Sequence, residues 1–388
     1  MNDELTRLEL LRRAALGGTV LTLPGILAAC GGDDDDEAGG TSTTGELADT
    51  LRFSNWQLYI DRDPKTKRIP SAEQFTAQTG VKVQYVEDVN DNATYFGKIQ
   101  GPLSQGRGID RDLIVMTDNS RFPALLVQKE WVEKLDKERI PNIENLIEAQ
   151  ASPPFDPDRE YSLPWLSGIT GIATNLKASG GEVVTTVDQL LEDPKLKGKV
   201  TLLTEVADTM SMIMLDNGDD PSKVTDESWK RAYDRVKKAV DSGQIRRFTG
   251  NDYVSDLERG NIAVAVSWSG DVATGLKANK DLRWNMPEKG SDIWTDNMLI
   301  PLEGHVPTAS EYMNFVYDPK IAAMIAVGSG FISPVKGVKD EAVKLDPESA
   351  SNPLIFPDDE ILSQVVQFDS AALNNQTYIE QWQKLLGA

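Results

Sequence analysis

The alternation of short apolar runs with longer amphipathic runs, from Leu51 onward, constrains the fold of this chain more than any other feature. Short apolar runs are typical of strands, and amphipathic runs with a period near 3.6 residues are typical of helices. Strands that alternate with helices predict an α/β protein with parallel-type sheets. We expect strands at 51–56, 81–86, 112–116, 168–174, 199–203, 245–249 and 261–268, and helices at 70–79, 92–105, 187–192, 209–215 and 228–240.

Two of the expected helices carry clear local signals. Pro70 lies in the first turn of one, and Gly80 follows its end, which is the usual placement of these two residue types. The last helix places four apolar side chains on one face: Trp229, Ala232, Val236 and Val240. That face is expected to pack against a sheet.

The chain begins with features of an export signal. Arg12 and Arg13 precede an uncharged run, 14–29, that is too short for a comfortable membrane span. Small residues lead up to Cys30, a pattern that resembles the bacterial lipobox, in which the signal is cut before a cysteine that then carries a lipid. We therefore expect a signal peptide at 1–29 and a lipid on Cys30. The paired arginines hint at twin-arginine export, and the sequence leaves the export route open.

The segment 30–49 is predicted to be a flexible linker, because its acidic and Gly/Ser/Thr-rich composition offers too little apolar surface to fold. Cys30 is the only cysteine, so no disulfide can form within the chain, and the exported body must rely on its hydrophobic core. Its length predicts about two domains. The expected location is extracytoplasmic, on a membrane anchored through Cys30.

The charge balance restricts the partners. Lys and Arg number 40 against 61 Asp and Glu, which gives a net charge of −21. Such a chain is not expected to bind nucleic acid. An acidic body attracts cations at long range. A generally soluble acidic surface explains the same charge equally well, so the charge alone does not define a site.

Residues that follow the expected strands are the candidates for a binding site, because ligands of open α/β sheets bind beyond the carboxyl ends of strands. Aromatic and acidic residues recur at these points. They come in pairs along the chain: Trp56 and Tyr59, Thr117 and Asn119, Glu205 and Asp208, Trp268 and Asp271, and Trp294 and Asp296. Indoles together with carboxylates indicate a site for an organic cation.

The clearest pair is Trp294 and Asp296, two residues apart. In an extended segment both project to the same side. A cation over an indole gains about 0.5–2 kcal/mol, and the carboxylate would neutralise its charge. The alternative is a core tryptophan beside a helix-capping aspartate. Similar alternatives hold for Asp208 and Asp271, which could cap the helices that follow them, and for Trp56 and Trp268, which could be core residues.

Taken in order, several motifs resemble those of the spermidine/putrescine-binding receptors of bacterial polyamine ABC importers. The resemblance runs from Phe53 to Leu386 and rests on five stretches: Asn55-Trp56-x-x-Tyr59, Tyr161-Ser162-Leu163-Pro164-Trp165, Leu203-Thr204-Glu205 to Asp208-Thr209-Met210, Trp268-Ser269-Gly270-Asp271 and Trp294-Thr295-Asp296. No single motif is decisive, but their order and spacing together are specific.

The resemblance implies a type II periplasmic-binding-protein-like fold. Each of two lobes would be a sheet flanked by helices, and crossing hinge strands would let the lobes close on ligand. Lobe I would comprise 51–165 and 297–345, and lobe II 166–296 and 346–388. The family implies a non-catalytic monomer without cofactor or metal, which passes a polyamine to the permease subunits of an ABC transporter.

The resemblance also implies roles for single residues. Three indoles, those of Trp56, Trp268 and Trp294, would sandwich the methylene chain. Asp296 would neutralise one ammonium group, and Glu205 with Asp208 another. Further contacts would come from Tyr59, Thr117, Asn119, Asp271, Phe331 and Gln367. Four positions depart from the family. Leu58 stands where some members have an acidic residue, Thr117 where the family often has Ser, and Asn119 and Phe331 where it can have Tyr. These departures leave the particular polyamine open.

Two other functions fit parts of the pattern. Paired carboxylates with tryptophans also occur in secreted glycoside hydrolases, and a receptor of the same fold could bind a neutral sugar. The sequence has no Gly-x-Ser-x-Gly turn and no His/Cys metal set, and its only histidine, His305, lies in a Pro/Gly-rich turn and is expected at the surface. Four carboxylates without a clamping arginine in these loops favour an amine.

Overall fold

One mixed β-sheet organises the protein in the computed structural model, which describes residues 45–387 apart from the side chains of 276–278. Its strands are β1 (Thr50–Trp56), β2 (Lys82–Val89), β3 (Leu113–Thr117), β4 (Ser162–Asn175), β5 (Val200–Leu203), β6 (Ile245–Thr249), β7 (Val264–Trp268), β8 (Leu282–Asn285), β9 (Ser291–Leu299) and β10 (Val365–Val366). Their order is β2-β1-β3-β9-β4-β7-β5-β6, with β10 beside β9 and β8 beside β4. The expected signal peptide and Cys30 lie outside the described residues.

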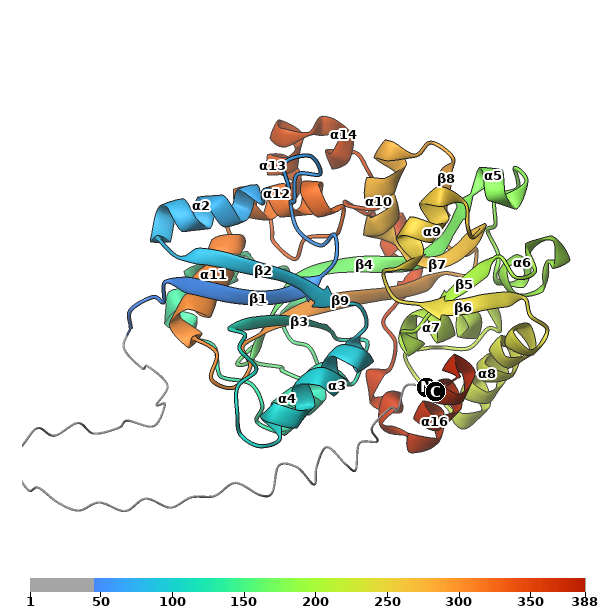
Figure 1. Cartoon of the computed structure of the whole chain (residues 1–388), viewed down its shortest axis with the longest axis horizontal. Coiled ribbons are helices and arrows are strands. Elements are labelled where there is room, and N and C mark those ends of the chain that lie inside the picture. The colour runs from blue at the N-terminus through green and yellow to red at the C-terminus, as the bar shows by residue number, and fades with distance from the viewer. Residues whose placement is uncertain (1–44, 388) are drawn as a thin grey trace, which may run out of the picture. The chain divides into compact units, whose positions relative to one another are not determined.

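The sheet consists of two parallel groups joined by an antiparallel centre. β1 runs parallel to β2 and β3, and β5 runs parallel to β6 and β7. Between these groups, β9 is antiparallel to β3 and β4, and β4 is antiparallel to β7. The prediction of parallel sheets is thus confirmed for both outer groups and wrong for the centre, where β4 and β9 run through the middle of the molecule (Figure 1).

In the centre, the strand predicted at 168–174 is shorter than the observed β4, because the residues before it lack a strand-like pattern. β4 spans 14 residues, all buried, whereas only 168–174 shows a strand-like pattern. Its remaining part mixes Ser, Pro and Trp, and the Ser and Gly residues within it interrupt the apolar run. These small and polar residues are accommodated because β4 pairs with β9 over 162–169 and with β7 and β8 over 170–175.

Helices cover both faces of the sheet (Figure 1). They are α2 (Pro70–Thr79), α3 (Asn92–Leu103), α4 (Phe122–Gln128), α5 (Leu176–Ser179), α6 (Val187–Glu192), α7 (Val206–Asp216), α8 (Asp226–Asp241), α9 (Tyr253–Arg259), α10 (Ser269–Ala278), α11 (Val306–Val316), α12 (Pro319–Ser329), α13 (Val338–Leu345), α14 (Pro347–Ala350), α15 (Asp359–Leu362) and α16 (Gln376–Leu386). Within residues 45–387, none of them is long and apolar enough to cross a membrane.

Local signals account for the helices that were predicted best. α2 has the predicted bounds, with Pro70 at its first position and Gly80 in the left-handed conformation, φ 81°, at its end. α8 begins with a capping box, in which Thr225 and Ser228 bond each other's backbone. Three of the four side chains on its predicted face are buried, and the fourth, Val240, is half-buried while Ala239 is buried instead.

Distant parts of the sequence pack on each parallel group. The ring of Phe53 in β1 meets that of Tyr312 in α11 edge-on, with centroids 5.5 Å apart. At the other group, Trp229 in α8 stacks on Tyr378 in α16 at 4.2 Å. The predicted lobe boundaries, at 165/166 and 296/297, fall inside β4 and β9. The division into two lobes with these boundaries stays a prediction.

Candidate ligand-binding site

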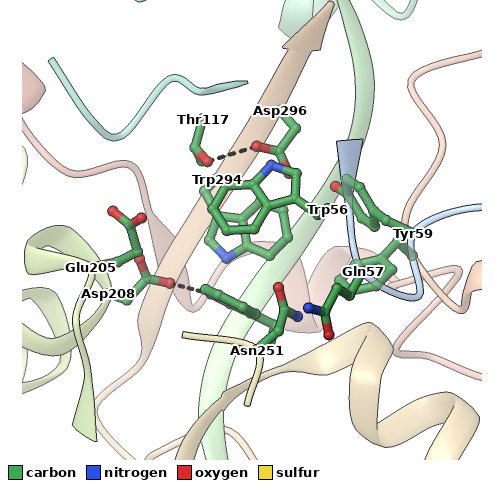
Figure 2. A pocket seen from close by; sticks show the side chains of 11 residues that line it. Trp56, Gln57, Tyr59, Thr117, Glu205, Asp208, Asn251, Trp294 and Asp296 are labelled. Atoms are coloured by element: carbon green, nitrogen blue, oxygen red, sulfur yellow. Dashed lines mark hydrogen bonds between the residues drawn. The ribbon is translucent and has the colours of Figure 1, made fainter. Parts of the chain in front are cut away.

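A pocket of about 320 Å³ lies at the carboxyl ends of β1, β3, β5 and β7 and beside β9 (Figure 2). Its lining comes from residues far apart in the sequence: Trp56, Gln57, Tyr59, Thr117, Glu205, Asp208, Asn251, Trp268, Trp294, Asp296 and Phe331. Nine of these were predicted as ligand contacts. The strand-end rule therefore located the pocket, because parallel strands bring their carboxyl ends to one edge of the sheet.

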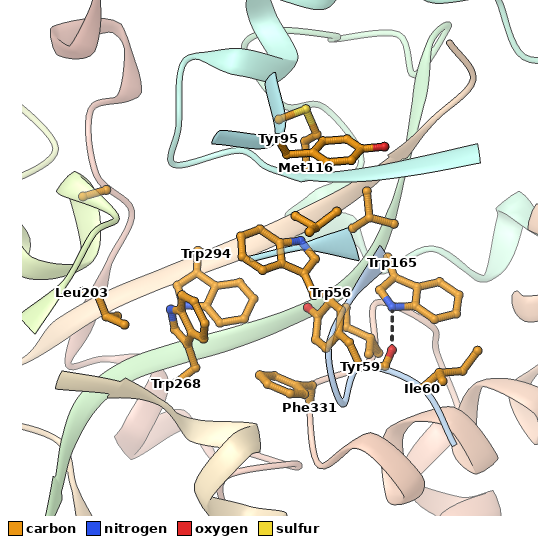
Figure 3. Packing of buried hydrophobic residues seen from close by; sticks show 14 of the residues in the cluster. Trp56, Tyr59, Ile60, Tyr95, Met116, Trp165, Leu203, Trp268, Trp294 and Phe331 are labelled. Atoms are coloured by element: carbon orange, nitrogen blue, oxygen red, sulfur yellow. Dashed lines mark hydrogen bonds between the residues drawn. The ribbon is translucent and has the colours of Figure 1, made fainter. Parts of the chain in front are cut away.

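Five aromatic rings form a continuous wall of the pocket (Figure 3). Trp268 meets Trp56 and Trp294 edge-on, with centroids 5.7 and 6.2 Å apart. Phe331 lies 5.9 Å from Trp294 and 4.6 Å from Tyr59. All five side chains are buried, so each ring holds its neighbours in place. The result is an apolar enclosure that could hold an alkyl chain.

Two glycines make this packing possible. A Cβ atom on Gly168 in β4 would lie 2.5 Å from the ring of Trp294, and one on Gly270 in α10 would lie 2.4 Å from the ring of Phe331. Both distances are far shorter than a normal contact. Any larger residue at either position would displace the ring and change the shape of the pocket.

Trp294 and Asp296 lie on the same side of β9, as their spacing predicts, and both line the pocket. The hydroxyl of Thr117 donates a hydrogen bond of 2.7 Å to Asp296 Oδ1. The carboxyl is buried, and desolvation raises its pKa to about 7, although the bond from Thr117 works in the opposite direction. Without ligand this carboxylate has no cationic partner in the pocket lining.

Glu205 and Asp208 form a second acidic group at the start of α7. Glu205 Oε1 accepts hydrogen bonds from the backbone and side-chain nitrogens of Asn92, at 2.6 and 3.0 Å. Asp208 Oδ1 accepts from Trp268 Nε1 at 2.8 Å. Burial raises the pKa of Glu205 to about 8 and also raises that of Asp208.

Neither capping alternative is correct. α7 begins at Val206, so Asp208 lies in its first turn and its carboxylate accepts from side chains instead. Asp271 likewise lies in the first turn of α10, where it accepts from Tyr253 and Asn251. In both helices the position before the first residue makes no side-chain capping bond.

Three predicted contacts lie behind the pocket lining. The amide of Asn119 donates to Asp292 at 2.7 Å and to Asp208 at 3.4 Å, so it is held between two carboxylates. Asp271 is turned toward Tyr253. Gln367 donates to Asp118 at 2.9 Å. Asp271 and Gln367 are held by partners outside the lining, and Asn119 reaches the lining only through Asp208. Tertiary packing supplies these partners, and no local pattern reveals them.

Two lining residues and two buried carboxylates near the pocket were not predicted from the sequence. Asn251 follows the strand at 245–249, and Gln57 lies inside the first-strand motif, so the strand-end rule could have found both. Asp118 and Asp292 are buried next to the site. Asp292 alternates with Trp294 and Asp296 along β9, and that period-two pattern was the available signal.

The site holds acidic groups without a basic partner. Its lining contains three acidic side chains and no Lys, Arg or His. The nearby buried Arg159 donates to the carbonyl oxygen of Gln150 and to Ser162 and Asn297, rather than to a carboxylate. His305, expected at the surface, is half-buried. It caps the start of α11, where its ring Nδ1 accepts a hydrogen bond from the backbone N–H of Thr308. Such a pocket favours a cationic guest, because buried carboxylates without counter-charge are costly.

Comparisons with known proteins agree with this description. A family model described as bacterial extracellular solute-binding protein matches residues 71–357. The spermidine/putrescine-binding periplasmic protein of Salmonella typhimurium is 25% identical over 338 residues, covering 87% of this chain and 91% of that protein. A solved structure described as a putative spermidine/putrescine ABC transporter from Listeria monocytogenes matches with a TM-score of 0.71 and 26% identity, covering 87% of this chain and 98% of the other.

The fold extends to more distant proteins. One of them is the binding protein AgtB from A. tumefaciens R10, solved with agropinic acid. It matches with a TM-score of 0.68 and 18% identity, and the match covers 88% of this chain and 100% of AgtB. At that identity the likeness concerns the fold alone. The predicted α/β fold of the periplasmic-binding-protein type is thereby confirmed. By the match of its family model over most of its length, the chain belongs to the bacterial extracellular solute-binding proteins.

Proposed function

We propose that this protein is a non-catalytic receptor that captures a polyamine, spermidine or putrescine, and delivers it to the permease subunits of an ABC importer. The observation that carries the proposal is the pocket itself. Acidic groups lie at Asp296 and at Glu205 with Asp208, and aromatic rings lie between them. A polyamine has ammonium groups separated by methylene chains, so its charges match the carboxylates and its chains match the indoles.

The ligand class rests on the pocket and on the relatives, since the fold by itself does not decide it. AgtB shares the fold and was solved with agropinic acid. In contrast, relatives that cover most of this chain are described as spermidine/putrescine-binding or putrescine-binding periplasmic proteins. The aromatic and acidic residues of the pocket belong to the sequence motifs that resemble those of polyamine receptors.

The first prediction is that calorimetric titration gives measurable binding of putrescine or spermidine and none of a neutral sugar. Binding should strengthen from about pH 5.5 to about pH 8. The pKa values of Asp296 and Glu205 are raised to about 7 and about 8, so the free pocket holds protons that a cation must displace. Affinity should change by up to about tenfold per pH unit for each proton released, while the amines stay charged.

Three results would contradict the proposal. Binding of a sugar without any polyamine would identify a receptor of the same fold with another ligand. Turnover of a glycoside by the purified protein would favour the hydrolase alternative. Polyamine affinity that is constant over this pH range would mean that the buried carboxyls do not meet the ligand.

We also infer closure of two lobes over the ligand and attachment to the outer face of the cell membrane. Asn92, the first residue of α3, donates hydrogen bonds to Glu205 at the start of α7, which supports a contact between the lobes when closed. The location follows from the relatives, described as periplasmic proteins, and from the lipobox-like pattern before Cys30. The receptor would act as a monomer without a cofactor.

The second prediction concerns Cys30. The Cys30→Ser variant should appear in the soluble extracytoplasmic fraction, while the wild type remains with membranes, because the serine cannot carry the lipid. Fractionation followed by immunoblotting measures this, and intact mass of the wild type reports cleavage and lipid. Of the described linker residues, 45–49, Leu47 packs against the core, and the substitution leaves that contact in place, so the melting temperature should not change. A variant that stays on the membrane would exclude lipidation as the anchor.

A further inference from the structure

We propose that Asn251 is a specificity-determining residue whose side-chain oxygen accepts a hydrogen bond from an ammonium group of the ligand, and that Tyr253 and Asp271 fix the direction of its amide. This inference rests on the proposed function and adds to it. Asn251 has no counterpart in the motifs by which the site was predicted, and Asp271 was expected to touch the ligand or to cap a helix.

The position of Asn251 suits this role. It follows β6, lines the pocket and is only 5% exposed. Its Nδ2 donates to Asp271 Oδ2 over 3.3 Å, while its Oδ1 has no hydrogen-bond partner. Figure 2 shows the side chain at the border of the pocket, with its oxygen turned toward Trp56. A buried acceptor without a partner is unfavourable, unless a ligand satisfies it.

The direction of the amide follows from a chain of hydrogen bonds that runs one way when Asp271 is ionised. The backbone N–H of Trp268 can only donate, and it donates to the hydroxyl oxygen of Tyr253 at 3.0 Å. The single proton of that hydroxyl is therefore free for Asp271 Oδ2, at 2.7 Å. Burial raises the pKa of Asp271 to about 7, so at a pH of about 8 its carboxylate is mostly ionised and only accepts, and Asn251 then turns its NH₂ group toward Asp271. Its oxygen then faces the pocket.

This arrangement selects for the chemistry of the guest. An ammonium group supplies N–H donors, and hydrogen bonds that involve a charged donor are stronger than neutral ones. A carboxylate of a ligand would meet the same oxygen as an acceptor and be disfavoured. Asp271 acts through Asn251 and is a positioning residue, since no part of it lines the pocket.

The test is calorimetric titration of the full mature protein with putrescine and with spermidine. Asn251→Leu keeps the approximate size and removes the acceptor, and should weaken the affinity for the bound polyamine about 10- to 100-fold, the range for one hydrogen bond to a charged group. The matched control is Asn261→Leu, an exposed residue outside the pocket, which should bind as the wild type does. If Asn251→Leu fails to fold, Asn251→Ala also removes the acceptor, and its polyamine affinity tests the same prediction.

A double-mutant cycle distinguishes a role of Asp271 in orienting Asn251 from a general loss of pocket structure. In Asp271→Asn, the new amide can donate to Asn251 and so allow its NH₂ group to turn into the pocket. Asp271→Asn should therefore weaken binding in the wild-type background by about tenfold or more. It should have little effect in the Asn251→Leu background, because there is no amide left to orient.

The outcomes are distinct. If the wild type binds neither polyamine, the proposed function fails and the inference with it. If the wild type binds and Asn251→Leu stays within about twofold of it, Asn251 is not a ligand acceptor, although the receptor function stands. If Asp271→Asn weakens binding equally in both backgrounds, the positioning role of Asp271 is wrong.

Discussion

Replacing Asp296 by asparagine is expected to weaken polyamine binding about 30- to 1000-fold, the largest effect of any single charge change in this protein. The ammonium group must leave water to enter the pocket, and Asp296 is the carboxylate that shares a strand face with an indole. Losing one partner of a buried charge pair costs about 2–4 kcal/mol. Asparagine has nearly the same size and can still accept the hydrogen bond from Thr117.

Stability measurements distinguish this loss from unfolding. Burial raises the pKa of Asp296 to about 7 in the folded protein, above its usual value near about 4. The folding free-energy cost of this carboxylate is absent below the unfolded pKa, grows as the pH rises from there, and is fully present above about pH 7. The ligand-free Asp296→Asn variant should then be at least as stable as the wild type at pH 8, as measured by urea unfolding.

A surface substitution provides the control. Asp234→Asn removes a charge from the exposed face of α8, where Asp234 pairs with Lys230, and should leave polyamine affinity unchanged. If Asp296→Asn binds the polyamine within about twofold of the wild type, the assignment of Asp296 as an ammonium partner is wrong.

Truncation of Trp294 to alanine is expected to have the second large effect, on both stability and binding. The side chain is 4% exposed and packs against Trp268 and Phe331. Its Nε1 donates to Thr170 over 3.2 Å. Removing a buried tryptophan costs about 3–5 kcal/mol of unfolding free energy, because the cavity left behind is only partly filled. The variant should also lose the cation–π surface and bind polyamine poorly.

Urea unfolding and calorimetry together test this expectation. Trp229→Ala is the matched control, since Trp229 is equally buried but lies in α8, outside the pocket, where it stacks on Tyr378. It should lose similar stability and retain affinity under conditions where it is folded. Trp294→Phe should retain more affinity than Trp294→Ala, because a smaller aromatic face remains. Unchanged polyamine affinity in folded Trp294→Ala would exclude the indole as a ligand surface.

Local sequence determined the elements whose signals are contained within one turn or one strand. Pro70 and Gly80 marked α2, and the apolar stripe beginning at Trp229 marked α8. These features depend on neighbours a few residues apart, and backbone geometry converts such spacings directly into structure. The placement of Trp294 and Asp296 on one side of a strand was also predictable from local sequence, because side chains two residues apart share a strand face.

Only the tertiary structure decided where the central strands run and which polar side chains reach the pocket. β4 pairs with β9 along its first part and with β7 along its second part, so its Ser and Gly residues need no strand-like pattern of their own. Asn119, Asp271 and Gln367 follow expected strands or fit the family, yet buried partners turn them away. Sequence spacing fixes which face of its own element a residue occupies, whereas the direction of a buried polar side chain depends on the donors and acceptors that distant segments place around it.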